Sequence, residues 1–246
     1  MKPQVFQRTE YKYLLNPEQY EEILPLIEAH LEKDRFSRST IQSLYYDTES
    51  RLLIRRSIEK PKYKEKLRLR SYGLVKPEDL VFLEIKKKYR GIVYKRRIEL
   101  SEKEAVSYLN RRSPRPDSQI GKEIDWVLNY YKNLSPSMLI VYDRVAYAEK
   151  GGGLRITFDS HIRFREDHLS LTYGLDGENL FAEEKILMEV KADSAIPLYL
   201  VRFLSEKRIF KTSFSKYGTA YAKTETKKKE EPAWKNYSTP SLQNQR

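Results

Sequence analysis

Alternating charges between positions 63 and 73 constrain the fold of this chain more than any other feature. The stretch reads YKEKLRLRSYG, and four cations, Lys64, Lys66, Arg68 and Arg70, occupy every second position. Because successive side chains of a β-strand point to opposite faces, all four cations lie on one face and the two leucines on the other. A row of like charges is self-repelling, so this strand predicts an anionic partner for its charged face.

The overall charge agrees with this interpretation. The 246 residues include 47 Lys and Arg against 35 Asp and Glu, which gives a net charge of +12. Such an excess favours polyanions, namely nucleic acid, a lipid surface or phosphate compounds. The chain contains no cysteine, which excludes disulfides, thiolate metal sites and cysteine nucleophiles.

The length favours one domain, expected over residues 1–223. Residues 224–246 are polar and lose all periodicity, so we expect a mobile tail there. The N-terminus lacks the apolar core of a signal peptide, and no apolar run approaches the length of a membrane span. These features predict a cytoplasmic protein.

The alternating pattern predicts an α+β fold that is mainly antiparallel β, with eight strands closing into a barrel or tunnel. Glycines at 91 and 151–153 mark hairpins, and residues 166–182 are expected to form a long loop. The expected strands are 4–15, 40–47, 62–73, 80–90, 92–100, 137–149, 153–165 and 184–192. The expected helices, which flank the sheet, are 17–32, 101–110, 118–133, 196–207 and 214–223.

A Glu-x-Lys pattern recurs in three of these strands. Residues two positions apart share a face of a strand, so each pair places a carboxylate and an ammonium side by side. The pairs are Glu10 with Lys12, Glu84 with Lys86, and Glu189 with Lys191. Further charged or polar rows are Tyr142 with Arg144, Arg155 with Thr157 and Asp159, and Lys95 with Arg97.

These rows allow two arrangements of the sheet. They could form the solvated outer face of a sandwich, or they could line the inside of a closed sheet whose apolar outer face is covered by helices. Protein surfaces usually mix charges of both signs, whereas cations outnumber carboxylates in row after row here, which favours the second arrangement. Inward cations need a filling of negative charge, such as a chain of phosphates, and inward carboxylates suit a hard divalent cation.

Other catalytic motifs are absent from the sequence. The three histidines, His30, His161 and His168, show no metal-binding spacing, and neither GxSxG nor HExxH occurs. The triple glycine lacks the Gly-Lys-Ser/Thr of a phosphate-binding loop. The 19 tyrosines suit base stacking in a nucleic-acid binder, although strands favour aromatic residues in any case.

In their order along the chain, these motifs make the sequence resemble the VTC domain of polyphosphate polymerases, a branch of the CYTH-like triphosphate tunnel enzymes. The resemblance runs from residue 5 to about residue 223. It is carried by RTEYKY at 8–13, QSLYYDT at 42–48, KLRLRSYG at 66–73, FLEIKKK at 82–88, YDR at 142–144, LRITFD at 154–159, MEVK at 188–191 and SFSKYGTAY at 213–221.

The resemblance implies an eight-stranded tunnel that binds a nucleoside triphosphate, such as ATP, and Mn²⁺ or Mg²⁺, and that adds the terminal phosphoryl group to a polyphosphate chain. It implies phosphate-binding catalytic cations at Lys12, Arg68, Arg70, Lys86, Arg144, Arg155, Lys191 and Lys216. It implies further substrate contacts at Arg8, Lys66, Tyr142, Ser215, Lys95 and Arg97. It implies a metal ligand at Glu189, and the inward carboxylates Glu84 and Glu10 are expected to be further ligands.

One departure from the family pattern concerns the hydrolases. The triphosphatase branch typically opens with ExExK, and here Arg8 replaces the first glutamate. This favours the polymerase branch. Two other functions stay open: a tunnel triphosphatase, and a non-catalytic basic module that binds nucleic acid or polyphosphate. Carboxylates among the cations would repel a nucleic-acid backbone, which argues against nucleic acid as the main ligand. A separate membrane protein as a partner agrees with the resemblance.

Overall fold

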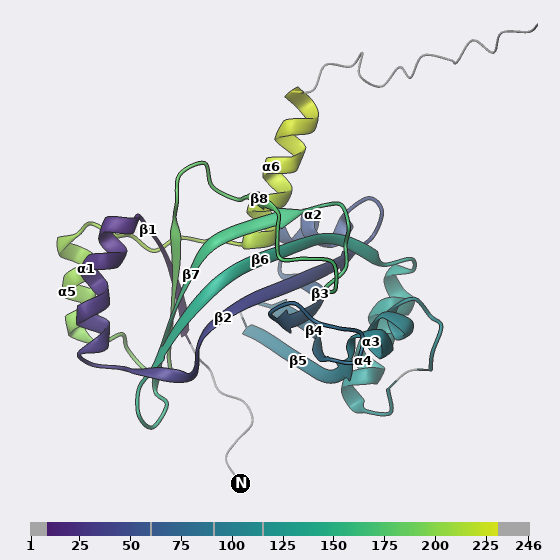
Figure 1. Cartoon of the computed structure of the whole chain (residues 1–246), viewed down its shortest axis with the longest axis horizontal. Coiled ribbons are helices and arrows are strands. Elements are labelled where there is room, and N and C mark those ends of the chain that lie inside the picture. The colour runs from purple at the N-terminus through teal and green to yellow at the C-terminus, as the bar shows by residue number, and fades with distance from the viewer. Residues whose placement is uncertain (1–8, 60, 91, 115, 231–246) are drawn as a thin grey trace, which may run out of the picture.

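The computed structural model describes residues 9–59, 61–90, 92–114 and 116–230, and it has an antiparallel sheet flanked by helices (Figure 1). The expected α+β class, mainly antiparallel β, is confirmed. The strands are β1 (Thr9–Leu15), β2 (Glu32–Asp47), β3 (Tyr63–Tyr72), β4 (Leu80–Tyr89), β5 (Ile92–Ser101), β6 (Ser135–Ala148), β7 (Leu154–Arg165), β8 (Glu178–Asn179) and β9 (Ile186–Ala192). The helices are α1 (Pro17–Glu28), α2 (Leu52–Ile58), α3 (Glu102–Leu109), α4 (Gln119–Tyr131), α5 (Leu198–Glu206) and α6 (Lys216–Glu230).

The strands pair in the order β1-β9-β7-β6-β2-β3-β4-β5, and β8 adds a short pairing to β7. Among the described residues no backbone pairing joins β5 to β1, so the expected closed ring is corrected to an open sheet. The sheet is nevertheless strongly curved. Lys12 on β1 and Lys66 on β3 both reach the segment before α6, at Phe214 and Ser215 respectively, although four strands lie between β1 and β3.

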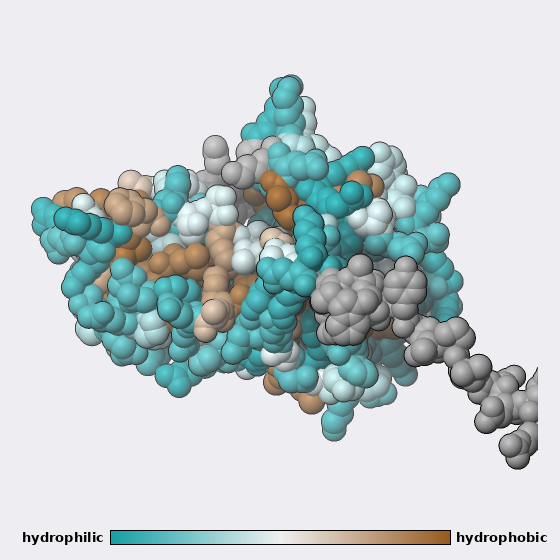
Figure 2. All heavy atoms as spheres, turned by 90° about the horizontal axis from the view of Figure 1, so that it is seen from above, coloured by the Kyte–Doolittle hydropathy of each residue, from teal (hydrophilic) through white to brown (hydrophobic). Residues whose placement is uncertain are grey.

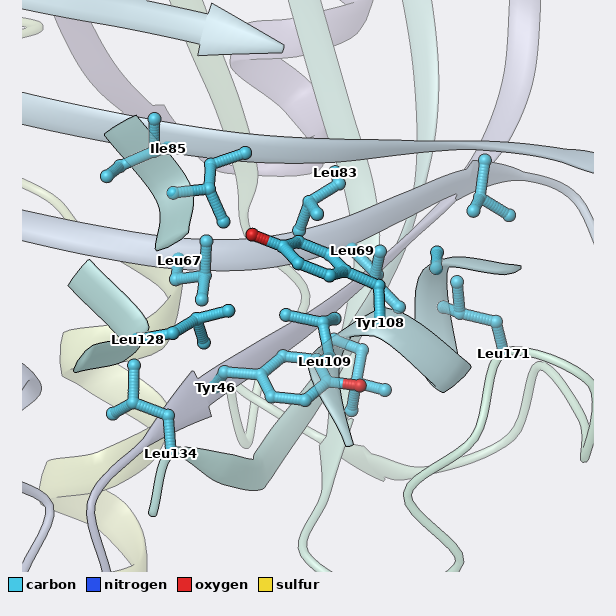
Figure 3. Close-up of a cluster of buried hydrophobic side chains, with 14 of the residues drawn as sticks. Tyr46, Leu67, Leu69, Leu83, Ile85, Tyr108, Leu109, Leu128, Leu134 and Leu171 are labelled. Atoms are coloured by element: carbon cyan, nitrogen blue, oxygen red, sulfur yellow. The ribbon is translucent and has the colours of Figure 1, made fainter. Parts of the chain in front are cut away.

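The convex face of the β3–β5 half packs on α3 and α4. Leu67 and Leu69 of β3, and Leu83 and Ile85 of β4, are fully buried there, together with Tyr108 of α3 (Figure 3). This is the apolar face that the alternation in β3 predicts. Its burial turns the cations of the same strand toward the concave side.

The convex face of the other half packs on α1 and α5. Apolar residues of β9 and β7, including Met188, Val190 and Ile156, meet Ile23 of α1 and Leu200 of α5. The convex face is thus covered by two pairs of helices, α3 with α4 on one half of the sheet and α1 with α5 on the other. Hydrophilic residues make up most of the surface seen from above in Figure 2, and hydrophobic residues gather toward the end occupied by α1 and α5.

A third apolar cluster closes one end of the concave face. Ile54 of α2 and Tyr217 of α6 pack against Ile140 and Leu187 of the sheet. Buried Asp47 at the end of β2 joins the two helices, because it accepts hydrogen bonds from the first backbone amides of α2 and from the Tyr217 hydroxyl at 3.0 Å. We call this end, covered by α2 and α6, the capped end.

Several element boundaries differ from the sequence expectations. β2 begins at Glu32 instead of residue 40, because its polar first half pairs with β6. Helix α2 was not expected, and α6 continues to Glu230, through the first residues of the predicted tail. The predicted loop at 166–182 contains β8, and the predicted hairpin at 151–153 joins β6 to β7. None of the helices in the described ranges is long and apolar enough to cross a lipid bilayer.

Candidate active site

Glu84 on β4 is the centre of one group of ion pairs on the concave face. It is 2% exposed and accepts a hydrogen bond from Arg68 Nε at 2.8 Å. Arg68 Nη2 lies 2.7 Å away, the Lys95 ammonium 2.6 Å and Arg70 3.8 Å. Burial alone would raise the pKa of Glu84, but Arg68, Arg70 and Lys95 lower this pKa to about 2. Three cations therefore share one carboxylate.

A second group surrounds two carboxylates on β7 and β9. Asp159 is completely buried and accepts two hydrogen bonds from Arg144, at 2.5 and 2.7 Å. It also pairs with Lys216 at the start of α6. Glu189 lies 3.3 Å from both Arg144 and Lys12. Burial raises the pKa of Glu189, but Lys216, Lys12 and Arg144 hold it well below its usual range.

Lys66 and Lys86 lie on neighbouring strands, between the two groups. Neither makes an ion pair within 4.0 Å among the described residues, and Lys66 donates only to the Ser215 hydroxyl, at 3.1 Å. Burial lowers the pKa of Lys66 to about 8, with Lys86 and other cations adding to the effect. Burial also lowers the pKa of Lys86, against the attraction of Glu10. This is a region of uncompensated positive charge.

The Tyr45 hydroxyl lies near the same cations, which shift its pKa. It accepts a hydrogen bond from Arg68 at 3.0 Å, and its ring stacks on Tyr217 at 4.3 Å between centroids. Burial would raise the pKa of Tyr45, but Arg68, Lys66 and Arg70 lower it to about 8. The Arg70 Nε and the Ser43 hydroxyl are buried without a hydrogen-bond partner among the described residues. A bound anion would supply the missing acceptor for Arg70.

The segment before α6 adds polar groups at the capped end. The Ser215 hydroxyl accepts hydrogen bonds from the Gly218 amide at 3.2 Å and from the Lys66 ammonium. Lys12 donates a hydrogen bond to the Phe214 carbonyl at 3.2 Å. The start of α6 is therefore fixed between β1 and β3. Lys216 follows directly and points at Asp159.

The other predicted site residues are distributed around these groups. Arg70 contacts the Tyr142 hydroxyl at 3.3 Å, and Lys191 lies 4.0 Å from Glu10. Arg155 pairs with Asp34 at 2.8 Å, at the end of the sheet opposite α6, and so does not join the central carboxylates. Arg97 lies over the Phe82 ring at 4.6 Å. Arg8 lies outside the described residues.

Sequence reasoning did not select two residues that are central in the structure. Asp159 was placed on the charged face by its spacing from Arg155, but spacing does not reveal that it is fully buried between Arg144 and Lys216. Tyr45 was one of many strand tyrosines. In both cases the signal is the partner on another strand, which the sequence leaves open.

Two of the three predicted metal ligands, Glu10 and Glu189, lie beside the same ammonium. Among the described residues, no group of three or more His, Asp or Glu forms a metal cage, and Glu84 lies in a different group from Glu10 and Glu189. The predicted three-glutamate set is therefore not brought together. Lys12, however, lies 3.4 Å from Glu10 and 3.3 Å from Glu189, so its ammonium brings these two carboxylates to one place. Magnesium-like ions commonly use one or two carboxylates plus substrate phosphates.

The family profile of the VTC domain matches residues 7–225, which is nearly the whole described chain. The chain belongs to the VTC domain family. It therefore has the fold of the triphosphate tunnel proteins, although its described strands form an open sheet and not a closed ring. No curated protein matches the sequence of this VTC domain.

One solved structure supports the fold, and a second is reported for comparison. A putative adenylyl cyclase from Hippeastrum, HpAC1, described as having a dominant triphosphatase activity, is 16% identical and superimposes with a TM-score of 0.51, covering 87% of this chain and 95% of its own. The PH1819 protein of Pyrococcus horikoshii is 15% identical, with a TM-score of 0.46 over 88% of this chain and 99% of its own.

Proposed function

We propose that this VTC domain is a polyphosphate polymerase that transfers the terminal phosphoryl group of a nucleoside triphosphate, ATP in the first instance, to an inorganic polyphosphate chain. One observation carries the proposal beyond the family: concave-face cations outnumber the carboxylates that neutralise them. Glu84 is shared by three cations, and Lys66 and Lys86 have no ion-pair partner within 4.0 Å in the described chain. A ligand with many phosphates supplies the missing charge.

Phosphoryl transfer requires the protein to position the two substrates and to neutralise the charge on their phosphates. Arg68 and Arg70 present guanidinium groups that match phosphate oxygens, and Arg144 is fixed by Asp159 so that its remaining donors keep one direction. A divalent ion, held by Glu189 and Glu10, would neutralise charge on the transferred group. The acceptor is the end of a phosphate chain and is already ionised, so no general base is needed.

Hydrolysis of a triphosphate is the second candidate. The specific observation in its favour is that Glu10 and Glu189 are close enough to share Lys12, which resembles a two-carboxylate metal site. The activity described for HpAC1 belongs to the same fold. A non-catalytic polyanion-binding module is less favoured, because buried carboxylates among the cations weaken simple electrostatic binding.

Incubation with ATP and Mn²⁺ tests the proposal. A polymerase yields ADP and a ladder of polyphosphate on a gel, stimulated by a short polyphosphate primer and weakened by salt, because each neutralised phosphate releases a counterion. Orthophosphate without polymer, under primed low-salt conditions, supports the triphosphatase instead. Binding of polyphosphate without any turnover would leave only the non-catalytic module.

A further inference from the structure

The end of the concave face opposite the capped end carries exposed apolar side chains. On β3, Tyr72 follows Arg70 on the same face, and on β4 Leu80 precedes Phe82 on the face that also carries Glu84. Tyr72 is 49% exposed and Leu80 is 64% exposed. Exposed apolar side chains beside a strongly charged surface indicate a ligand with an apolar part.

These side chains form one connected surface. The Tyr72 and Phe82 rings meet edge to face with centroids 5.7 Å apart, and the Arg97 guanidinium lies 4.6 Å from the centre of the Phe82 ring. Arg97 makes no ion pair with a carboxylate among the described residues, so its charge is free to serve a ligand. We call Tyr72, Leu80, Phe82 and Arg97 the mouth cluster.

The mouth cluster continues directly into the phosphate-binding surface. Phe82 is the cross-strand partner of Arg70, and Arg68 is the partner of Glu84 one step deeper. Two residues along a strand span about 6.6 Å. A ligand that places phosphates on Arg68 and Arg70 therefore extends its other end over Tyr72.

We propose that the mouth cluster binds the nucleobase of the nucleoside triphosphate, an inference that rests on the proposed function. A flat apolar ring joined to a polyphosphate matches a surface that changes from aromatic to cationic within one strand step. Aromatic rings and guanidinium planes stack on any base, because every base has a π-face, so the cluster accepts nucleotides broadly rather than selecting one. An inorganic polyphosphate makes no use of Tyr72.

The test compares two ligands that differ only in the nucleoside. Calorimetric titration of the wild type and of Tyr72→Ala is done with ATP and with inorganic tripolyphosphate, each with Mn²⁺. The variant should bind ATP about fivefold or more weakly, since base stacking on an aromatic side chain is lost. Its affinity for tripolyphosphate should stay within about twofold, because the phosphate contacts remain. Tyr72→Trp should restore ATP binding.

Tyr89→Ala is the matched control. Tyr89 is also a half-exposed tyrosine, 45% exposed, but it lies at the other end of β4 and on the opposite face. It should bind both ligands like the wild type. Equal losses for ATP and tripolyphosphate in Tyr72→Ala, or unchanged ATP binding, would overturn the nucleobase site and leave the polymerase proposal standing. Failure of the wild type to bind either ligand would overturn both proposals.

Discussion

Arg144 donates two hydrogen bonds to Asp159, and this carboxylate is completely inaccessible to solvent. The two residues are cross-strand partners on β6 and β7, and both face the concave side. Because Lys216 approaches the same carboxylate from α6, one buried anion fixes cations from a strand and from a helix.

Asp159→Asn should lower the free energy of unfolding by about 3 kcal/mol, since it leaves Arg144 and Lys216 without their buried counter-charge. Urea denaturation measures the loss, and added tripolyphosphate should restore part of it. Asp125→Asn is the control, because it breaks a surface pair with Arg111 and should cost less than about 1 kcal/mol. Equal losses in the two variants would contradict the assignment.

Replacing both Arg68 and Arg70 with methionine should weaken tripolyphosphate binding by about 100-fold or more, because hydrogen bonds to charged groups contribute about 1.5–3 kcal/mol each. Titration calorimetry checks the affinity, and thermal melting checks that the variant stays folded. Arg96→Met, an exposed residue on the other face of β5, is the control and should bind normally. Unchanged affinity in the double variant would show that the concave cations do not hold the ligand.

Glu189→Gln should keep tripolyphosphate binding largely intact but lose metal-dependent turnover, because the amide retains the shape without the charge that attracts a divalent cation. Activity is measured across a Mn²⁺ titration. Glu183→Gln, an exposed carboxylate, serves as the control. Normal turnover at every Mn²⁺ concentration would exclude Glu189 as a metal ligand.

Affinity for tripolyphosphate should fall as the pH rises from 7 to about 9.5. Burial lowers the pKa of Lys66 to about 8, so its ammonium is present below that pH and is lost above it, within a range where an ordinary lysine stays charged. Lys95, with a pKa of about 8 that burial lowers, adds to the same decline. Lys66→Met should bind more weakly at pH 7 and show a flatter pH profile. A steep decline that persists in the double variant Lys66→Met with Lys95→Met would contradict the role of these lysines.

The parts of the fold that depend on local alternation could be predicted, and the parts that depend on distant partners could not. Leu67 and Leu69 alternate with cations, which set both the strand and its faces. Helix α2 was missed because its start is held by Asp47, from the preceding strand, rather than by a residue of the helix itself. The predicted closure of the sheet was wrong, because alternation carries no information about which edge strands pair.

The same reasoning applies to the site. Parity along each strand placed the cations and carboxylates on one face, and the structure brings most of them together. Parity could not tell that Glu84 and Glu189 belong to different ion-pair groups, because that depends on how far apart β4 and β9 lie in the curved sheet. Nor could it tell that Arg155 turns to Asp34.

The first strand of the sheet pairs with the last, and this has a consequence for synthesis on the ribosome. β1 has its only described strand partner in β9, residues 186–192, and Lys216 follows later still. β1, which carries Glu10 and Lys12, therefore has no described strand partner until residue 192 has emerged, while β3, β4 and β5 can form their hairpins early. A nascent chain interrupted before residue 216 carries Arg68 and Arg70 without Lys216, so anion binding should begin only after residue 216 has emerged.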